Sequence, residues 1–259
     1  MQTFLFDMDG TLTEARRPAK KEIAEALFNL SAFGDVGILT GSHLKYVIEQ
    51  LSILINNIDK FKNKLFILPC NGTQFYEVLK DKQISNISSN NMIEEVGHNT
   101  YIHLLHSICD LQSEFSENYL EIPHGQFVQY RGSLLNWCPI GRSATTFFRK
   151  EFVEKDTQNL IRKQLIKKLN NKLYKNNMQD HLELVLGGST SIDIYPIGWG
   201  KEYALRYFGG SGVYFWGDKC FGDGNDVTIY NKLYPMGCAF SVDSVQETID
   251  SIKTFVKKM

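Results

Sequence analysis

Long hydrophobic runs are absent from this sequence of 259 residues. Its uninterrupted apolar segments are only a few residues long, so none of them can span a bilayer. An excess of charge of one sign is also absent, because 28 Lys and Arg residues against 29 Asp and Glu residues leave a net charge of −1. That balance excludes a broad electrostatic surface for nucleic acid, although a local basic pocket is compatible with it. Hydrophobic residues at 43% and charged residues at 22% of the chain indicate a globular protein.

Cysteine pairs are absent as well. The cysteines are odd in number and scattered along the chain without any C-x-x-C pair; the five are Cys70, Cys109, Cys138, Cys220 and Cys238. This usage indicates reduced thiols rather than a disulfide framework. The N-terminal residues MQTFLFDMDG lack the basic segment and the apolar core of a secretory signal. We therefore expect a cytoplasmic protein.

Two stretches of the chain, 1–82 and 199–259, contain short apolar strands that alternate with amphipathic helices. Such alternation predicts a parallel sheet covered by helices on both faces, so we expect one Rossmann-like α/β core built from both stretches. Ser42 is the expected N-cap of one helix, and Ser244 with Glu247 forms a capping box for the last. The expected strands are 3–6, 36–39, 64–69, 213–216 and 238–242, and the expected helices are 18–30, 42–51 and 245–252.

The middle of the chain, residues 83–198, has a different pattern. Its strands and helices are grouped instead of strictly alternating, which predicts an inserted α+β domain. The expected helices are 91–111, 145–154 and 159–174, and the expected strands are 126–131, 134–138, 182–186 and 192–195. Residues 209–212, Gly-Gly-Ser-Gly, are expected to form a turn before the strand at 213–216 rather than a phosphate loop, because no helix follows them.

Polar side chains follow the strands of the expected parallel sheet, at the edge where such sheets bind ligands. Asp7 and Asp9 follow the first strand, and Asp218 follows the strand at 213–216. Three carboxylates in one place repel by several kcal/mol unless a cation lies among them. Since oxygen ligands of this kind suit Mg²⁺, we expect these three aspartates to form a Mg²⁺ site. Further candidate ligands follow in the same segment: Asp223, Asn225 and Asp226.

The same arrangement suits phosphoryl transfer. Asp7 can attack phosphorus once a cation screens the charges of carboxylate and phosphate. Asp9 can act as a general acid–base, first on the leaving oxygen and later on the acceptor hydroxyl, while Lys201 can neutralise the nucleophile and the phosphate. Each aspartate alone is more often an ordinary turn residue, but the ordered set favours catalysis. Phosphate oxygens can be bound at a helix N-terminus by Thr40, Gly41 and Ser42.

Arginine is concentrated in one part of the insertion. Three of the seven arginines of the chain, Arg131, Arg142 and Arg149, fall within 19 residues. Arginine binds phosphate with two parallel hydrogen bonds, so this group predicts a second phosphate site on the insertion, facing the Asp7 site. The alternative is that each is a surface cation at the end of a strand or helix.

These motifs resemble those of a known superfamily. The segments FLFDMDGTLT and TGS, the lysine at 201 and the segment GDKCFGDGND are similar to the four motifs of haloacid-dehalogenase-like phosphotransferases. The inserted middle resembles the type C2B cap of that superfamily. More specifically, QYRGSLLNWCPIGRSATTFFR and SIDIYPIGWGKEYALR closely resemble the eukaryotic phosphomannomutases, and the likeness covers nearly the whole chain.

The resemblance implies a substrate, a cofactor and an assembly. Enzymes of this family interconvert mannose 6-phosphate and mannose 1-phosphate through a hexose 1,6-bisphosphate of mannose or glucose, need Mg²⁺, and are homodimers joined through their caps. Their product supplies GDP-mannose synthesis. Carried over to this sequence, the resemblance implies that sugar hydroxyls are bound by Ser191 and Asp193, and that substrate phosphate is bound by Arg16, Arg131, Arg142 and Arg149.

Two other functions stay open. One is a capped Mg²⁺-dependent sugar-phosphate phosphatase, and the other is an inactive module that binds sugar phosphate or forms dimers. Three departures from the family pattern bear on this choice. Residues 40–43 read Thr-Gly-Ser-His where the family usually has Gly-Gly-Ser-Asp, Asp223 adds a carboxylate, and His124 lies in a stretch that is usually more basic.

Overall fold

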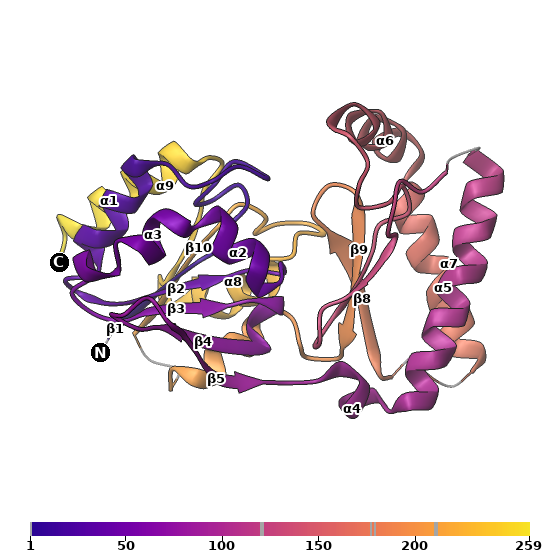
Figure 1. The fold of residues 1–259 in the computed structure, drawn as a ribbon, viewed down its shortest axis with the longest axis horizontal. Coiled ribbons are helices and arrows are strands. Elements are labelled where there is room, and N and C mark those ends of the chain that lie inside the picture. Colours follow the sequence, from indigo (N-terminus) through magenta and orange to yellow (C-terminus); the bar gives the residue numbers. More distant parts are fainter. Residues whose placement is uncertain (1, 120–121, 177, 179, 210–211) are drawn as a thin grey trace. The chain divides into compact units, whose positions relative to one another are not determined.

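The computed structural model describes residues 2–119, 122–176, 178, 180–209 and 212–259 (Figure 1). The chain forms two compact units. The first contains Met1–Ser89 and Trp199–Met259, and the second is Asn90–Gly198. No described helix has the length and apolar character needed to cross a membrane. Of the glycine-rich turn expected before the strand at 213–216, residues 210–211 lie outside the described part.

A seven-stranded sheet forms the centre of the first unit, in the order β11-β10-β1-β2-β3-β4-β5. The five strands from β11 to β3 are parallel, while β4 and β5 extend the sheet as an antiparallel hairpin. Parallel pairing brings the carboxyl ends of the parallel strands to one edge. The strands are β1 (Gln2–Phe6), β2 (Gly34–Leu39), β3 (Leu65–Leu68), β4 (Gln74–Val78), β5 (Ile84–Ser89), β10 (Val213–Gly217) and β11 (Ala239–Ser241).

The β4–β5 hairpin is not predicted by the sequence pattern. Most side chains of β5 are exposed and none is fully buried, so the alternation that indicates a half-buried strand is absent there. A turn around Lys82, whose φ is +68°, connects the two strands, and Asp81 accepts a hydrogen bond from the Gln83 amide at 3.0 Å. Because β5 pairs with β4, the two units divide after Ser89, not after residue 82 as the sequence pattern suggested.

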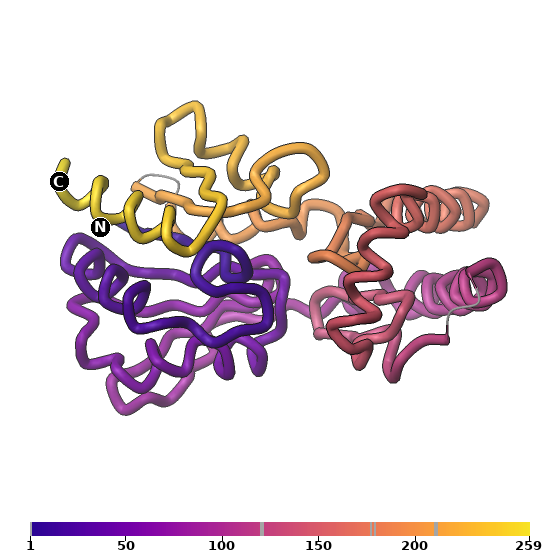
Figure 2. Tube along the Cα trace, turned by 90° about the horizontal axis from the view of Figure 1, so that it is seen from above, coloured from indigo at the N-terminus to yellow at the C-terminus, as the bar shows by residue number. Residues whose placement is uncertain are grey.

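Alternate side chains of the strands form two hydrophobic clusters, as expected for a sheet covered on both faces. Phe4 and Phe6 belong to the cluster that includes buried residues of α1, α3 and α9, whereas Leu5 belongs to the cluster that includes residues of α8. Helices α1 and α9 lie side by side (Figures 1 and 2). The helices are α1 (Lys21–Leu30), α2 (Leu44–Gln50), α3 (Ser52–Asn56), α8 (Val227–Leu233) and α9 (Val245–Val256), with short 3₁₀ turns η1 (Ile58–Lys60), η2 (Cys70–Gly72), η3 (Lys201–Tyr207) and η4 (Tyr234–Met236).

Two predicted helix caps had different outcomes. Ser244 does cap α9, because its side chain accepts a hydrogen bond from the Glu247 amide at 3.2 Å. The prediction that Ser42 caps the following helix is wrong. The cap of α2 is His43, whose Nδ1 accepts a hydrogen bond from the Tyr46 amide at 3.2 Å. An imidazole nitrogen can thus replace the hydroxyl that is more usual at this position.

The second unit has a four-stranded antiparallel sheet in the order β6-β7-β9-β8. Its helices α5 and α7 lie side by side (Figures 1 and 2). The long helix expected from residue 91 is interrupted at Gly97, whose φ of +81° ends α4 and lets α5 begin. The elements are α4 (Met92–Val96), α5 (His98–Tyr119), β6 (Val128–Tyr130), β7 (Leu135–Trp137), α6 (Thr146–Asn159), α7 (Ile161–Lys175), β8 (Leu182–Gly187) and β9 (Ser191–Pro196).

Candidate active site

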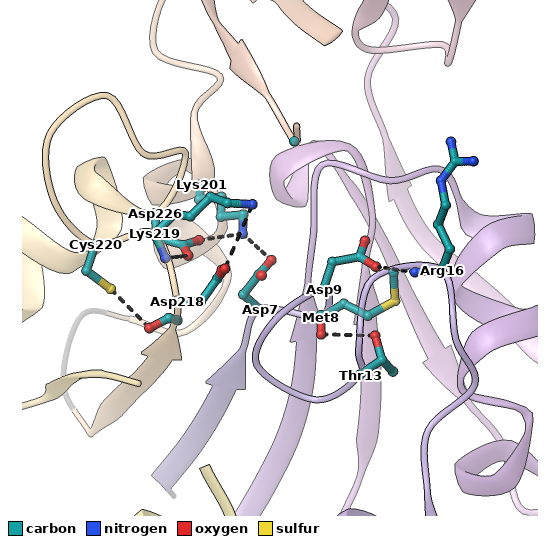
Figure 3. A network of polar contacts seen from close by, with 12 residues as sticks. Asp7, Met8, Asp9, Thr13, Arg16, Lys201, Asp218, Lys219, Cys220 and Asp226 are labelled. Atoms are coloured by element: carbon teal, nitrogen blue, oxygen red, sulfur yellow. Dashed lines mark hydrogen bonds and ion pairs between the residues drawn. The ribbon is translucent and has the colours of Figure 1, made fainter. Parts of the chain in front are cut away.

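Three carboxylates meet at the carboxyl edge of the first unit's sheet. Asp7 follows β1, Asp218 follows β10, and Asp226 precedes α8; oxygen atoms of all three lie within 4.8 Å of one another. Lys201, the first residue of η3, is fully buried and forms ion pairs with Asp7 and Asp226 (Figure 3). Asp226 also accepts a hydrogen bond from the Lys219 amide at 3.0 Å. The four segments are therefore held together by buried polar contacts.

The charges of this group do not balance. Three carboxylates lie together, and Lys201 is the ammonium group that pairs with two of them. Burial raises the pKa of Asp7 to about 8, with further contributions from Asp226 and Asp218, although Lys201 opposes the shift. Burial also raises the pKa of Asp218. The surplus of negative charge favours the uptake of a proton or a cation.

Two buried oxygen atoms near this group are candidate ligands for a metal ion. Oδ1 of Asp218 and Oδ1 of Asn225 are buried, and neither has a hydrogen-bond partner among the described residues. Buried polar atoms without a partner are rare and costly, and coordination to a cation would satisfy such an atom. The donor set of carboxylate and amide oxygens is of the type that binds Mg²⁺. The residues present thus fit the expected metal ion.

The expected ligand set differs in part from the geometry. Within the described residues, the acidic group that could hold an ion comprises Asp7, Asp218 and Asp226 and does not include the side chain of Asp9. Asp226, a secondary candidate in the sequence, belongs to the centre of the group because it is fully buried beside Lys201. Asp223 is exposed and lies outside the group. A residue's distance along the chain from the strand end did not indicate which carboxylate points inward.

The carboxylate of Asp9 lies beside the Arg16 backbone, apart from the group formed by Lys201, Asp7 and Asp226 (Figure 3). Its Oδ1 accepts hydrogen bonds from the Tyr46 hydroxyl at 3.1 Å and from the Arg16 amide at 3.3 Å. The side chain of Arg16 is exposed. Gly10, which directly follows Asp9, has a φ of +97°, and a Cβ there would lie 2.4 Å from Oδ2 of Asp218. The close approach of these segments therefore requires glycine.

The loops after β2 and β3 are joined to each other. The Thr40 hydroxyl accepts a hydrogen bond from the Ser42 amide at 3.1 Å, and the Thr40 carbonyl accepts one from the Asn71 amide at 2.9 Å. The Ser42 carbonyl accepts from the Cys70 amide at 3.0 Å, and Gly41 is buried. Asn71 has a φ of +62°, a left-handed conformation that asparagine tolerates better than most residues. These contacts fix the segment expected to bind phosphate.

In the second unit, Arg142 and Asp193 are connected through a residue that the sequence analysis did not identify. Arg142 Nη1 donates to Asn136 Oδ1 at 2.7 Å, and Asn136 Nδ2 donates to Asp193 Oδ1 at 2.6 Å. Asn136 lies on β7 directly opposite Asp193 on β9, so the sheet register brings the two together. A Cβ on Gly187 would lie 2.6 Å from the Asp193 carboxylate, which explains the glycine there.

The other arginines of this unit bind its own backbone and side chains. Arg149 donates to the carbonyls of Ala144 at 3.1 Å and Arg142 at 2.8 Å, and to the Thr190 hydroxyl at 2.6 Å. These bonds anchor Arg149 within its own unit. Arg131 Nε donates to Gln129 at 3.1 Å.

Another arginine, Arg162 on α7, contacts the turn between β8 and β9, and the sequence did not indicate it. Arg162 is nine-tenths buried, pairs with Asp156 at 2.6 Å, and donates to the carbonyls of Ser191 and Gly188, both at 3.1 Å. Ser191 and Asp193, the expected sugar-binding residues, are both buried. Arg162 therefore supports the backbone from which Ser191 projects.

Two solved structures share the fold at low sequence identity. IMP-bound, N-terminally truncated Plasmodium falciparum IMP-nucleotidase matches with a TM-score of 0.68 and 14% identity, covering 99% of this chain and 68% of that chain. The C-terminal domain of trehalose-6-phosphate phosphatase from C. albicans matches with a TM-score of 0.60 and 14% identity, covering 100% of this chain and 93% of that chain. Both support the expected α/β fold, and at this identity they show the fold alone.

Sequence relatives are much more similar. The chain is 33% identical to a phosphomannomutase from Schizosaccharomyces pombe, covering 96% of this chain and 92% of that protein. It is 32% identical to phosphomannomutases from Saccharomyces cerevisiae, covering 96% and 91%, and from Glycine max, covering 96% and 94%. The family model described as eukaryotic phosphomannomutase matches residues 23–258. With a match over so much of its length, the chain belongs to the eukaryotic phosphomannomutase family.

Proposed function

We propose that this chain is a phosphomannomutase, an isomerase that interconverts mannose 6-phosphate and mannose 1-phosphate. The relatives that carry this name match nearly the full length of the chain. The observation that carries the proposal is the buried group of Asp7, Lys201 and Asp226, because it combines a nucleophile with a fixed countercharge. Such an arrangement suits an enzyme better than an inactive module, which has no need of a buried surplus of charge.

Asp7 is the proposed nucleophile. One of its carboxylate oxygens forms a bond to phosphorus, the bond between phosphorus and the sugar oxygen breaks, and the electron pair remains on the sugar oxygen. Asp9 donates a proton to that oxygen. In the return step Asp9 accepts a proton from the sugar hydroxyl that attacks phosphorylated Asp7. Lys201 donates a hydrogen bond to Asp7 and so holds the nucleophile in one orientation.

We propose Mg²⁺ as the cofactor. Asp7, Asp218 and Asp226 would hold it, with Asn225 contributing its amide oxygen. The ion would screen the repulsion between the carboxylate and the incoming phosphate. The buried oxygens of Asp218 and Asn225 without hydrogen-bond partners support this assignment.

A mutase differs from a phosphatase because its substrate must present two positions in turn to the same nucleophile. We propose a hexose 1,6-bisphosphate, of mannose or glucose, as the activator and intermediate. Arg131 and Arg142 would bind the phosphate that is not reacting, and Arg149 would support them from within the second unit. Ser191 and Asp193 would bind sugar hydroxyls, Arg16 would contact substrate phosphate, and residues 40–42 would bind the oxygens of the transferred group.

The wider setting follows from the family resemblance. We propose that the first unit, which comprises residues 1–82 and 199–259 together with the remainder of the β4–β5 hairpin through Ser89, is the catalytic core, and that the second unit, Asn90–Gly198, is the cap that determines substrate specificity. We propose a homodimer formed through the caps, a cytoplasmic location and a product that supplies GDP-mannose synthesis. No partner of nucleic acid or membrane type is proposed.

A coupled assay tests the function. Mannose 1-phosphate and glucose 1-phosphate are each supplied with and without Mg²⁺ and glucose 1,6-bisphosphate, and both the isomerised hexose 6-phosphate and free phosphate are measured. The proposal expects isomerisation that needs Mg²⁺ and is stimulated by the bisphosphate. Free phosphate without isomerisation would instead identify a sugar-phosphate phosphatase. Unchanged activity in an Asp7→Asn variant would contradict the role of Asp7.

A further inference from the structure

Tyr46, on α2, contacts the proposed general acid–base although no sequence motif pointed to it. Its hydroxyl donates to Oδ1 of Asp9 at 3.1 Å. The Arg16 amide donates to the same carboxylate oxygen at 3.3 Å and to the Tyr46 hydroxyl oxygen at 3.1 Å. The three residues thus form a closed set of hydrogen bonds that joins α2, the loop after β1 and the Arg16 backbone.

The two bonds to Asp9 are both made by one carboxylate oxygen. Within the described part of the chain, Oδ1 accepts from Tyr46 and Arg16, while Oδ2 accepts from no residue. A carboxylate held through one oxygen keeps a fixed orientation and leaves the other oxygen for proton transfer. Proton transfer needs that second oxygen to approach the reacting atom within hydrogen-bond distance.

The position of Tyr46 is itself fixed by local structure. Its backbone amide donates to Nδ1 of His43, the residue that caps α2 in place of the expected Ser42. Burial, together with the nearby Asp9 carboxylate, raises the pKa of the Tyr46 phenol above its ordinary value, so the hydroxyl keeps the proton that it donates. Arg16, whose amide donates to the same oxygen, has a φ of +63°, an uncommon conformation for a residue other than glycine.

We propose that Tyr46 is a positioning residue that holds Oδ1 of Asp9, so that Oδ2 exchanges the proton with the sugar oxygen during phosphoryl transfer. This inference depends on the proposed role of Asp9 as the general acid–base. It deepens the proposed function without depending on whether the acceptor is a sugar or water, since in both reactions the departing sugar oxygen must gain a proton.

The leaving group provides the test. When Asp7 is phosphorylated by glucose 1,6-bisphosphate, the sugar oxygen leaves and needs a proton. When acetyl phosphate is the donor, acetate leaves as a stable anion and needs none. A misplaced Asp9 therefore slows the first reaction and spares the second, whereas general damage to the site slows both.

The experiment measures single-turnover phosphorylation of the enzyme with Mg²⁺ and each donor, in the wild type and in Tyr46→Phe. Phenylalanine keeps the ring and removes only the hydroxyl. We expect a loss of about ten-fold with the bisphosphate, the effect of losing a hydrogen bond to a charged group, and less than about two-fold with acetyl phosphate. Because each variant gives a ratio of two rates, partial unfolding cancels. Tyr76→Phe is the matched control, since the Tyr76 hydroxyl donates to Gln74, a residue outside the site.

The outcomes separate the inference from the proposed function. Equal slowing with both donors, or slowing with neither, would overturn the role of Tyr46. An Asp9→Asn variant with no contrast between donors would overturn the role of Asp9 and the inference with it. If the wild type produces free phosphate and no isomer, the mutase proposal fails. In that case the same contrast, measured with glucose 6-phosphate in place of the bisphosphate, still tests Tyr46.

Discussion

Replacing Lys201 by methionine tests the charge arrangement on which the site depends. Lys201 is fully buried and pairs with both Asp7 and Asp226. Methionine fills a similar space without charge, so the effect measured is mainly electrostatic. Removing one partner of a buried ion pair costs about 3–5 kcal/mol, because the remaining charges stay buried without compensation. We expect the free energy of unfolding of the metal-free protein to fall by about this amount at alkaline pH.

Urea unfolding in the presence of EDTA measures this loss. Lys219→Met is the matched control, because Lys219 lies 3.8 Å from Asp218 but its side chain is 42% exposed. Exposed pairs contribute about 0–1 kcal/mol, so the control should change little. The Lys201→Met loss should shrink toward pH 5, where a proton can replace the missing ammonium group on the carboxylates. A loss equal to that of the control, or independent of pH, would refute the reasoning.

Three further predictions concern the two units. The pKa of Asp7 is raised from 3.8 to about 8, so the folded protein retains a proton that the unfolded chain releases; the stability of the metal-free protein should fall as the pH rises between these values. In urea unfolding at a series of pH values, Asp7→Asn should reduce this decrease of stability with pH; an unchanged dependence of stability on pH would contradict the raised pKa of Asp7. Mg²⁺ at about 100 times its Kd should stabilise the wild type by about 2.7 kcal/mol; in thermal unfolding Asp218→Asn should lose most of this effect, and a retained shift would exclude Asp218 as a ligand. Arg162→Met should cost about 3–5 kcal/mol because Asp156 stays buried, and adding Asp156→Leu should restore much of it; a double variant no more stable than the single one would argue against an electrostatic cause.

The parallel strands of the core, and the functional residues that follow them, could be predicted from the sequence. Short apolar strands such as 3–6 and 213–216 are recognisable because a buried parallel strand must be apolar on both faces. Asp7 and Asp218 directly follow β1 and β10, so the chain alone indicated that these two carboxylates meet. Polar strands are harder to recognise: β5 has mostly exposed side chains, and the sequence analysis did not find its pairing with β4.

Which side chains meet within the site was decided only by the tertiary structure. The carboxylate that lies close to Asp7 and Asp218 is that of Asp226 and not that of Asp9. The direction of a side chain depends on backbone angles, which cannot be read from the spacing of residues in a motif. Tyr46 contacts Asp9, which lies 37 positions away in the sequence, and Asn136 contacts Asp193, which lies 57 positions away. No local sequence pattern therefore indicates either contact. Local residue preferences thus determined the helices, the strands and the kinds of side chain available for chemistry. Long-range packing determined which oxygen atoms face one another, because a contact between distant segments forms only when both segments are folded in place.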